Sequence, residues 1–211
     1  VSLTAWLPAT QRPEILVVAS IHGDEAETTV VLSDALRSID PGDLINGAVL
    51  CANPDGILRG TRGNALGVDL NRNFPAANWS PEPVAYKSRR QGPRDIELSP
   101  GADQASEPET RALLSLLEET RPRAVVSLHA ALAVIDDAGA SQLGKNIAER
   151  TGLPLEADIG YPTPGSFGSW AGERDLCVVT YEFEAASLYD LKDRHAPVLA
   201  DLLTGRLGFG D

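Results

Sequence analysis

The sequence has few of the features that mark secreted, membrane or nucleic-acid-binding proteins. Its 211 residues include two cysteines, Cys51 and Cys177, and each lies in an apolar run. We therefore expect two buried thiols in a reducing compartment rather than a disulfide framework. No apolar segment approaches the roughly 20 residues that a membrane span needs, and no basic-then-apolar signal peptide opens the chain. These absences favour a cytoplasmic protein without a membrane partner.

Positive charge is scarce as well. Lysine and arginine together number 18 against 30 aspartates and glutamates, so the net charge is -12 at pH 7. A surface of this charge repels nucleic acid and anionic membranes, and we expect neither as a partner. The length and the 43% hydrophobic content suit a single globular domain over residues 1–211.

Apolar runs alternate with amphipathic segments along the chain. The pattern predicts buried strands at residues 14–21, 47–54, 124–129 and 177–184, and helices at residues 25–38, 106–122, 140–152 and 189–204. We expect Ser106 to be the N-cap of the helix at 106–122, with Glu109 completing a capping box. Residues 55–105 are expected to form a long irregular stretch, which is typical of a functional segment. The alternation predicts an α/β three-layer sandwich, in which helices flank a mixed, largely parallel central sheet.

Three of the expected strands lead into residues with metal-binding chemistry. His22 and Glu25 follow the first strand, His129 ends the strand at 124–129, and Glu182 lies in the last strand. Parallel strands would bring these ends to one edge of the sheet. Two imidazoles and a carboxylate form a common ligand set for catalytic zinc, and a further carboxylate can act as a general base. A His-x-x-Glu pair alone could equally be a polar loop, and His195, among charged neighbours, is expected at the surface.

Residues 53–75 add further motifs to the candidate metal-binding residues, and together they make a specific signal. Six motifs follow one another in the chain: "HGDE" at 22–25, "NPDG" at 53–56, "TR" at 61–62, "DLNRNF" at 69–74, "SLH" at 127–129 and "TYE" at 180–182. In this order they resemble the zinc carboxypeptidase family of the carboxypeptidase A type. Within that family, "RGTRGNALGVDLNRNFPAANW" and "GYPTPGSFGSWA" resemble the bacterial murein peptide amidase branch.

The resemblance implies one Zn²⁺ ion per chain, and it implies roles for eight residues. His22, Glu25 and His129 match the zinc ligands, Glu182 matches the general base, and Arg62 matches the arginine that helps to hold the oxyanion. Asn71 and Arg72 match the pair that grips a substrate carboxylate. Tyr161 matches a tyrosine that lies over the substrate.

The same resemblance implies a cytoplasmic amidase that hydrolyses the γ-D-glutamyl–meso-diaminopimelate bond of a small murein tripeptide during cell-wall recycling. Two alternatives stay open. One is an N-acyl amino acid deacylase of the aspartoacylase and succinylglutamate desuccinylase type, which shares the "HG-x-E" opening and a "DLNR" stretch. The other is a zinc-bearing peptide-binding protein without catalysis, and the intact Glu182 argues against it.

Some positions depart from the family pattern or carry two interpretations. Digestive relatives have arginine where this chain has Asp24, so we expect Asp24 to contact the ammonium group at the D-centre of diaminopimelate. Glu184, two residues after Glu182, should face the same side of its strand and is a rival base. Asp69 could orient a ligand histidine or hold its own loop. Residues 76–105 could form a wall that restricts entry to small peptides, and they include Trp79, Tyr86, Arg89 and Arg90.

Overall fold

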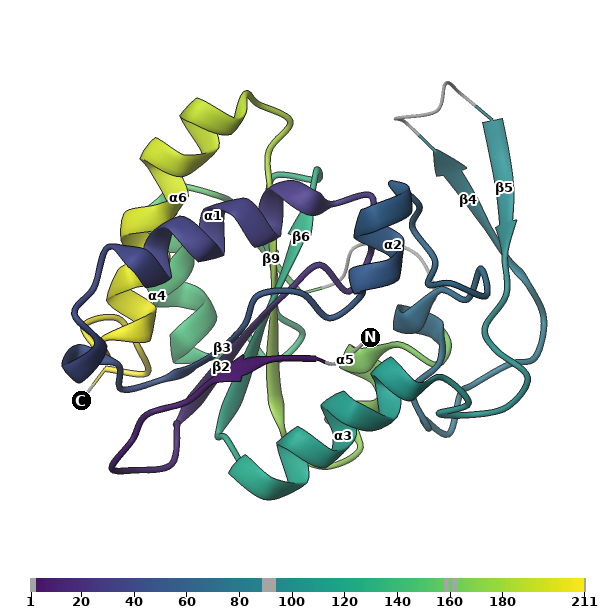
Figure 1. Cartoon of the computed structure of the whole chain (residues 1–211), viewed down its shortest axis with the longest axis horizontal. Helices are drawn as coiled ribbons and strands as arrows, with labels where there is room; N and C mark the ends of the chain where they lie inside the picture. Colours follow the sequence, from purple (N-terminus) through teal and green to yellow (C-terminus); the bar gives the residue numbers. More distant parts are fainter. Residues whose placement is uncertain (1–2, 89–93, 158–159, 161–162, 211) are drawn as a thin grey trace.

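A seven-stranded mixed sheet forms the centre of the protein. The computed structural model describes residues 3–88, 94–157, 160 and 163–210 (Figure 1). The strands lie in the order β1-β3-β2-β6-β9-β7-β8. Their bounds are β1 Ala5–Trp6, β2 Ile15–Ala19, β3 Gly47–Val49, β6 Ala124–Ala130, β7 Val134–Asp136, β8 Leu155–Glu156 and β9 Cys177–Phe183. The central strands β3, β2, β6 and β9 are parallel, whereas β1 and β7 pair antiparallel with β3 and β9. The prediction of a mixed, largely parallel sheet is confirmed.

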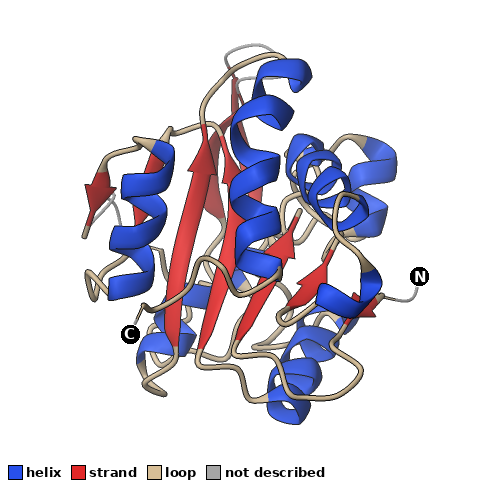
Figure 2. Ribbon diagram, turned by 90° about the vertical axis from the view of Figure 1, so that its left-hand side faces the viewer, coloured by secondary structure: helices blue, strands red, loops and turns tan. Residues whose placement is uncertain are grey.

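Helices cover both faces of the sheet. One layer contains α1 (Ala26–Arg37), α4 (Gln142–Thr151) and α6 (Leu188–Leu203), and the other contains α3 (Pro108–Thr120) and α5 (Phe167–Gly172). Figure 2 shows the long central strands side by side, with helices in front of and behind them. Together with the sheet, the helices make the three layers that the sequence predicted.

Alternation along β2 explains why its sequence is apolar throughout. Ile15, Val17 and Ala19 pack into the core beneath α1, α4 and α6. Leu16 and Val18 pack into the second core, beneath α3 and α5. A parallel strand covered on both faces needs apolar side chains at every position. The site lies beyond the carboxyl end of this rigid, fully buried strand.

The segment from 55 to 105 is more regular than predicted. It contains part of α2 (Pro54–Arg59), the 3₁₀ turn η2 (Leu70–Arg72), and the antiparallel pair β4 (Val84–Ser88) and β5 (Arg94–Leu98). Figure 1 shows β4 and β5 projecting away from the central sheet. A second 3₁₀ turn, η1 (Pro41–Asp43), lies between α1 and β3. The prediction of a long irregular stretch is therefore wrong for these parts.

The caps of α4 and α3 are formed in different ways. Ser141 caps α4 through the amide of Gly144, and Gly152 ends that helix in the left-handed conformation. Ser106 does not cap α3, whose N-cap residue is Glu107. The Ser106 hydroxyl instead donates to the Glu107 carboxylate at 2.7 Å, so the predicted capping box is wrong.

His195 is fully buried, which overturns the prediction of a surface position. Its Nδ1 lies 2.6 Å from the Tyr181 hydroxyl, its Nε2 lies 2.8 Å from Oε2 of Glu184, and its ring stacks on Phe183. His195 shares the inward face of α6 with Leu191 and other buried apolar residues at helical spacing. That spacing, rather than the charged neighbours, decides where the histidine lies.

Two expectations about the rest of the chain have simpler outcomes. Both Cys51 and Cys177 are free thiols, but each is half-buried rather than fully buried. Within the described residues, no helix combines the length and the apolar character that crossing a bilayer requires.

Candidate active site

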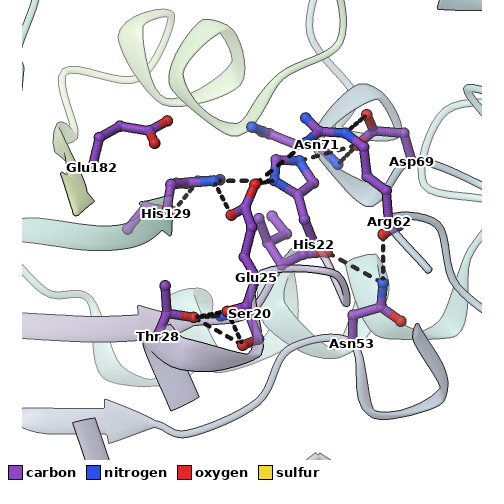
Figure 3. A network of polar contacts seen from close by, with 12 residues as sticks. Ser20, His22, Glu25, Thr28, Asn53, Arg62, Asp69, Asn71, His129 and Glu182 are labelled. Carbon is purple, nitrogen blue, oxygen red and sulfur yellow. Dashed lines mark hydrogen bonds and ion pairs between the residues drawn. The ribbon is translucent and has the colours of Figure 1, made fainter. Parts of the chain in front are cut away.

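Three neighbouring strands bring the predicted site residues together. His22 and Glu25 lie in the loop that follows β2, and His129 lies one residue before the end of β6. Glu182 lies on β9, where it is the register partner of His129. Because β2, β6 and β9 are parallel neighbours, their carboxyl ends meet at one edge of the sheet. Figure 3 shows the four side chains gathered there.

His22, Glu25 and His129 form a buried group that could hold a metal ion. Oε1 of Glu25 lies 2.9 Å from Nδ1 of His22, and Oε2 lies 3.0 Å from Nδ1 of His129. The two Nδ1 atoms are 3.1 Å apart. Two nitrogens that bind one zinc ion at ~2.0–2.1 Å in tetrahedral geometry are about 3.3 Å apart. The donor types and their spacing therefore fit zinc.

The second nitrogen of each histidine lies close to a polar side chain. Nε2 of His22 lies 3.3 Å from Oδ1 of Asp69. Nε2 of His129 lies 3.0 Å from the Ser127 hydroxyl. Contacts of this kind fix ring orientation and tautomer, so that Nδ1 points toward the shared centre. Ser127 precedes His129 by two residues, so strand alternation was the signal that could have revealed its role.

Asp69 fulfils both of the roles that the sequence left open. Beside its contact with His22, its Oδ1 accepts a 2.9 Å hydrogen bond from the amide of Asn71, which fixes the start of η2. Its Oδ2 accepts a 3.1 Å hydrogen bond from Nε of Arg62. One buried carboxylate therefore ties together a candidate ligand, an arginine and the loop between them.

The loop that carries His22 and Glu25 is held by two hydroxyl groups, one from Ser20 directly after β2 and one from Thr28 in the first turn of α1. The hydroxyls of Ser20 and Thr28 are 2.8 Å apart, and both donate to the backbone carbonyl of Glu25 (Figure 3). Thr28 also accepts from the amide of Ser20 at 3.0 Å. This network fixes the turn from β2 into α1. Neither residue was singled out from the sequence, because an isolated serine or threonine carries no specific signal.

Gly23 explains why a glycine follows His22. A Cβ at this position would lie 2.1 Å from the backbone carbon of Gly56. The Gly23 amide donates to the Arg62 carbonyl at 3.1 Å, and the same carbonyl accepts from the Asn53 side chain at 3.1 Å. The backbones of the "HGDE" and "NPDG" motifs are thus pressed together, with Arg62 fixed against both.

Arg62 places its guanidinium beside the candidate ligands. Nη1 lies 3.3 Å from Oε1 of Glu25 and Nε bonds to Asp69. The ring of Tyr86 lies 4.2 Å from the guanidinium carbon, an arrangement typical of a cation–π contact. Tyr86 comes from β4, so the segment that was expected to form a wall does reach the site. Arg89 and Arg90, also expected in that wall, lie outside the described residues.

Buried charges balance one another around the metal group. Burial and Arg62 act to lower the pKa of His22, but Glu25 and Asp69 outweigh them and raise it to about 9. Burial acts to raise the pKa of Glu25, yet His22 and His129 bring it below its usual range. Asp69 likewise has a pKa well below its usual range because Arg62 and His22 outweigh burial. These carboxylates are therefore ionised and favour a cation at this centre.

Glu182 and Glu184 have different surroundings, which overturns the expectation that they face the same side. Burial, opposed by His129 and assisted by Glu25, raises the pKa of Glu182, and its Oε2 accepts from the Leu132 amide at 3.4 Å. Glu184 lies beyond the end of β9, where His195 binds one oxygen and Arg194 binds the other at 2.5 Å. Only Glu182 faces the metal group, because the chain turns toward α6 after Phe183.

Asn71 and Arg72, the predicted carboxylate grip, lie in the turn η2 that Asp69 caps. Oδ1 of Asn71 accepts from the Phe167 amide at 2.9 Å, so its NH₂ end is the one that can donate to a substrate. Arg72 is 6% exposed, and its Nη1 donates to the Asn71 carbonyl at 2.7 Å. Tyr161, the remaining predicted contact, lies outside the described residues.

Comparisons with known proteins agree with this site. The family model described as zinc carboxypeptidase matches residues 46–135. Murein peptide amidase A of Escherichia coli strain K12 is 44% identical over 197 residues, which cover 93% of this chain and 81% of that protein. The crystal structure of the murein-tripeptide amidase from Escherichia coli O157 has a TM-score of 0.90 at 43% identity, over 97% of this chain and 86% of that one.

The fold alone extends to more distant structures. Carboxypeptidase A from Helicoverpa armigera has a TM-score of 0.71 at 18% identity, over 92% of this chain and 61% of that one. The resemblance that the six sequence motifs suggested is confirmed. The chain is a hydrolase and belongs to the zinc carboxypeptidase family.

Proposed function

We propose that the protein is a cytoplasmic zinc amidase that hydrolyses the γ-D-glutamyl–meso-diaminopimelate bond of small murein peptides. One observation carries the proposal: the group formed by His22, Glu25 and His129 is complete, and Glu182 lies beside it, in a chain 44% identical to a murein peptide amidase. A purely structural metal site would not need an adjacent carboxylate with a raised pKa.

The three candidate ligands have chemistry suited to one Zn²⁺ ion. When bound, zinc would polarise the scissile carbonyl and make an attacking water more acidic. His22 and His129 would present Nδ1, because Asp69 and Ser127 engage their other nitrogens. Glu25 would supply the carboxylate ligand.

Glu182 and Arg62 would handle the proton and the developing charge. The raised pKa of Glu182 suits a group that takes a proton from water and later returns it to the leaving amine. Arg62 stays cationic, because Asp69 and Glu25 more than offset the effect of burial on its pKa. Its guanidinium, held by Glu25 and Asp69, has further N–H donors for an oxyanion.

Asn71 and Arg72 would bind a carboxylate on the leaving diaminopimelate. Both lie next to Asp69, and the packing of Asn71 against Phe167 fixes the direction of its amide. A planar guanidinium suits a carboxylate because it can bind both oxygens. By the family resemblance, we also assign Tyr161 the role of covering the bound substrate.

The test uses the full chain loaded with zinc. It is incubated with L-alanyl-γ-D-glutamyl-meso-diaminopimelate and, separately, with N-succinylglutamate, and the products are identified by mass spectrometry. We expect free diaminopimelate from the first and no succinate from the second. Glu182→Gln serves as the control for a contaminating hydrolase.

The other outcomes point to the alternative functions. Release of succinate would support a deacylase and overturn the proposal. Tight binding of the tripeptide without turnover by the zinc-loaded chain would instead support a peptide-binding protein.

A further inference from the structure

Asp24 is a buried carboxylate that forms no direct ion pair with any described residue. It lies between Gly23 and Glu25 and is 8% exposed. Its Oδ1 has no hydrogen-bond partner, and no described lysine, arginine or histidine forms an ion pair with it. A buried charge is costly unless it is paired, and the few unsatisfied groups in a native protein often belong to ligand sites.

Asp24 lines a cavity of about 490 Å³ next to the metal group. The loop of residues 59–67 forms one side of this cavity, and Tyr86 with residues 96–98 forms the other. Arg62 lines the cavity and also contacts Glu25. The cavity therefore adjoins the metal group through Arg62 and through Asp24, the residue before Glu25.

The charges that line the cavity favour a cation. Arg62 is already ion-paired with Glu25 and Asp69. Arg59 is exposed and donates to the Ala65 carbonyl. Among the described residues that line the cavity, Asp24 is the buried charged residue that forms no ion pair. Asn71 and Arg72, which suit an anionic group, do not line the cavity.

We propose that Asp24 binds an ammonium group of the substrate inside this cavity. The inference rests on the proposed function and adds a specificity determinant to it. The proposed tripeptide offers two such groups: the ammonium at the far centre of diaminopimelate, and the free amino terminus of L-alanine. An ammonium group would give Oδ1 of Asp24 a charge-assisted hydrogen bond, which is stronger than one between neutral groups.

The experiment compares Asp24→Asn with the unchanged chain, both loaded with zinc, on three peptide substrates. The first is the parent tripeptide. The second carries 2-aminopimelate, which keeps the far carboxylate but lacks the far ammonium. The third carries an N-acetyl group on L-alanine. Glu119→Gln is the control, because Glu119 is an exposed carboxylate on α3 that does not line the cavity.

We expect Asp24→Asn to lower kcat/KM for the parent tripeptide on the order of 10- to 100-fold. This fall in kcat/KM should nearly vanish on the substrate that lacks the ammonium bound by Asp24. The substrate on which it vanishes therefore shows which of the two ammonium groups Asp24 binds. Glu119→Gln should change kcat/KM less than about threefold. The thermal midpoint of Asp24→Asn should not fall, because the substitution removes a buried, unpaired charge.

Equal losses on all three substrates, or no loss on any, would overturn the inference while leaving the amidase function intact. If the unchanged chain does not cleave the parent tripeptide, the proposed function fails. The inference is then decided by calorimetric binding of the same three peptides to the unchanged chain and to Asp24→Asn. A binding loss confined to peptides that carry one particular ammonium supports it, and equal binding to both chains refutes it.

Discussion

The Nδ1 atoms of His22 and His129 lie 3.1 Å apart, although 107 residues separate the two histidines. Glu25 completes the group by placing one oxygen against each ring. The rings cannot turn freely, because Asp69 and Ser127 engage their opposite nitrogens. The three donors are therefore arranged for a metal ion by the fold itself, which lowers the ordering cost of binding.

Zinc should bind to the folded chain and stabilise it. At a free zinc concentration of about 100 times Kd, the free energy of unfolding should rise by about 2.7 kcal/mol. His22→Ala and His129→Ala should each remove stoichiometric zinc, as measured by calorimetry and metal analysis. Glu182→Gln is the control and should retain zinc. Undiminished zinc binding by His129→Ala would show that another group of residues holds the metal.

Gly23→Ala should disrupt the site through a steric clash with backbone atoms. The new methyl group would lie 2.1–2.5 Å from backbone atoms of Gly56 and Ile57, which cannot move as a flexible side chain could. We expect a loss of about 1–3 kcal/mol in the free energy of unfolding, together with weaker zinc binding. Gly42→Ala is the control, because a Cβ there meets nothing within 4 Å. Equal stability of the two variants in urea unfolding would contradict this account.

The sequence predicted the metal group well for a physical reason. A strand buried on both faces is an apolar run in the sequence. The apolar run of β2 ends shortly before His22 and Glu25, so the sequence showed that these two residues lie at the edge of the sheet. The same logic located His129 at the end of β6. The six ordered motifs then linked these positions to a family.

Other features depend on contacts that a linear sequence does not display. The strands β4 and β5 contain charged residues in short segments and lie outside the main sheet, so their apolar pattern is weak. Glu184 leaves the metal side only because β9 ends at Phe183 and α6 supplies His195. His195 itself was misplaced because charged neighbours in sequence were weighted above its helical spacing.

Glu182→Gln should abolish most of the hydrolysis without unfolding the protein. The amide cannot accept the proton from water, so kcat should fall on the order of 100- to 10,000-fold while zinc content stays unchanged.

Glu184→Gln should keep kcat within a few-fold but lower the free energy of unfolding by about 1–3 kcal/mol, because Arg194 and His195 lose their charged acceptor. Steady-state kinetics and urea unfolding of both variants test this pair. A larger kinetic defect in Glu184→Gln would reverse the assignment of the base.

Arg62→Lys should lower kcat more than it weakens substrate binding. A lysine keeps the charge but loses the planar fork that reaches Glu25 and Asp69 together. We expect a fall in kcat on the order of 100- to 1,000-fold with a small change in KM, since an oxyanion exists only near the transition state. Arg59→Lys in the same loop is the control and should behave like the unchanged chain. A defect confined to KM would place Arg62 in ground-state binding instead.

The buried His195 should make the free energy of unfolding fall as the pH drops below about 6.5. Burial, which outweighs the attraction of Glu184, lowers its pKa below the ordinary value of 6.5. The neutral ring satisfies both partners, because Nε2–H donates to Glu184 and Nδ1 accepts from Tyr181. Arg194, which holds the other oxygen of Glu184, also disfavours the protonated ring.

The sign of the effect follows from the proton balance. Just below pH 6.5 the unfolded chain binds a proton at this histidine and the folded chain does not, so acid favours unfolding. The contribution of His195 is complete above pH 6.5 and is lost as the pH falls, by at most about 1.4 kcal/mol per pH unit. His195→Gln removes the titration, so its unfolding free energy should decline less steeply between pH 7 and pH 5, even if it is lower throughout. Urea unfolding at several pH values measures both slopes, and Arg37→Gln, at an exposed position on α1, should keep the slope of the unchanged chain. Parallel profiles for the unchanged chain and His195→Gln would show that this histidine does not set the acid limit of stability.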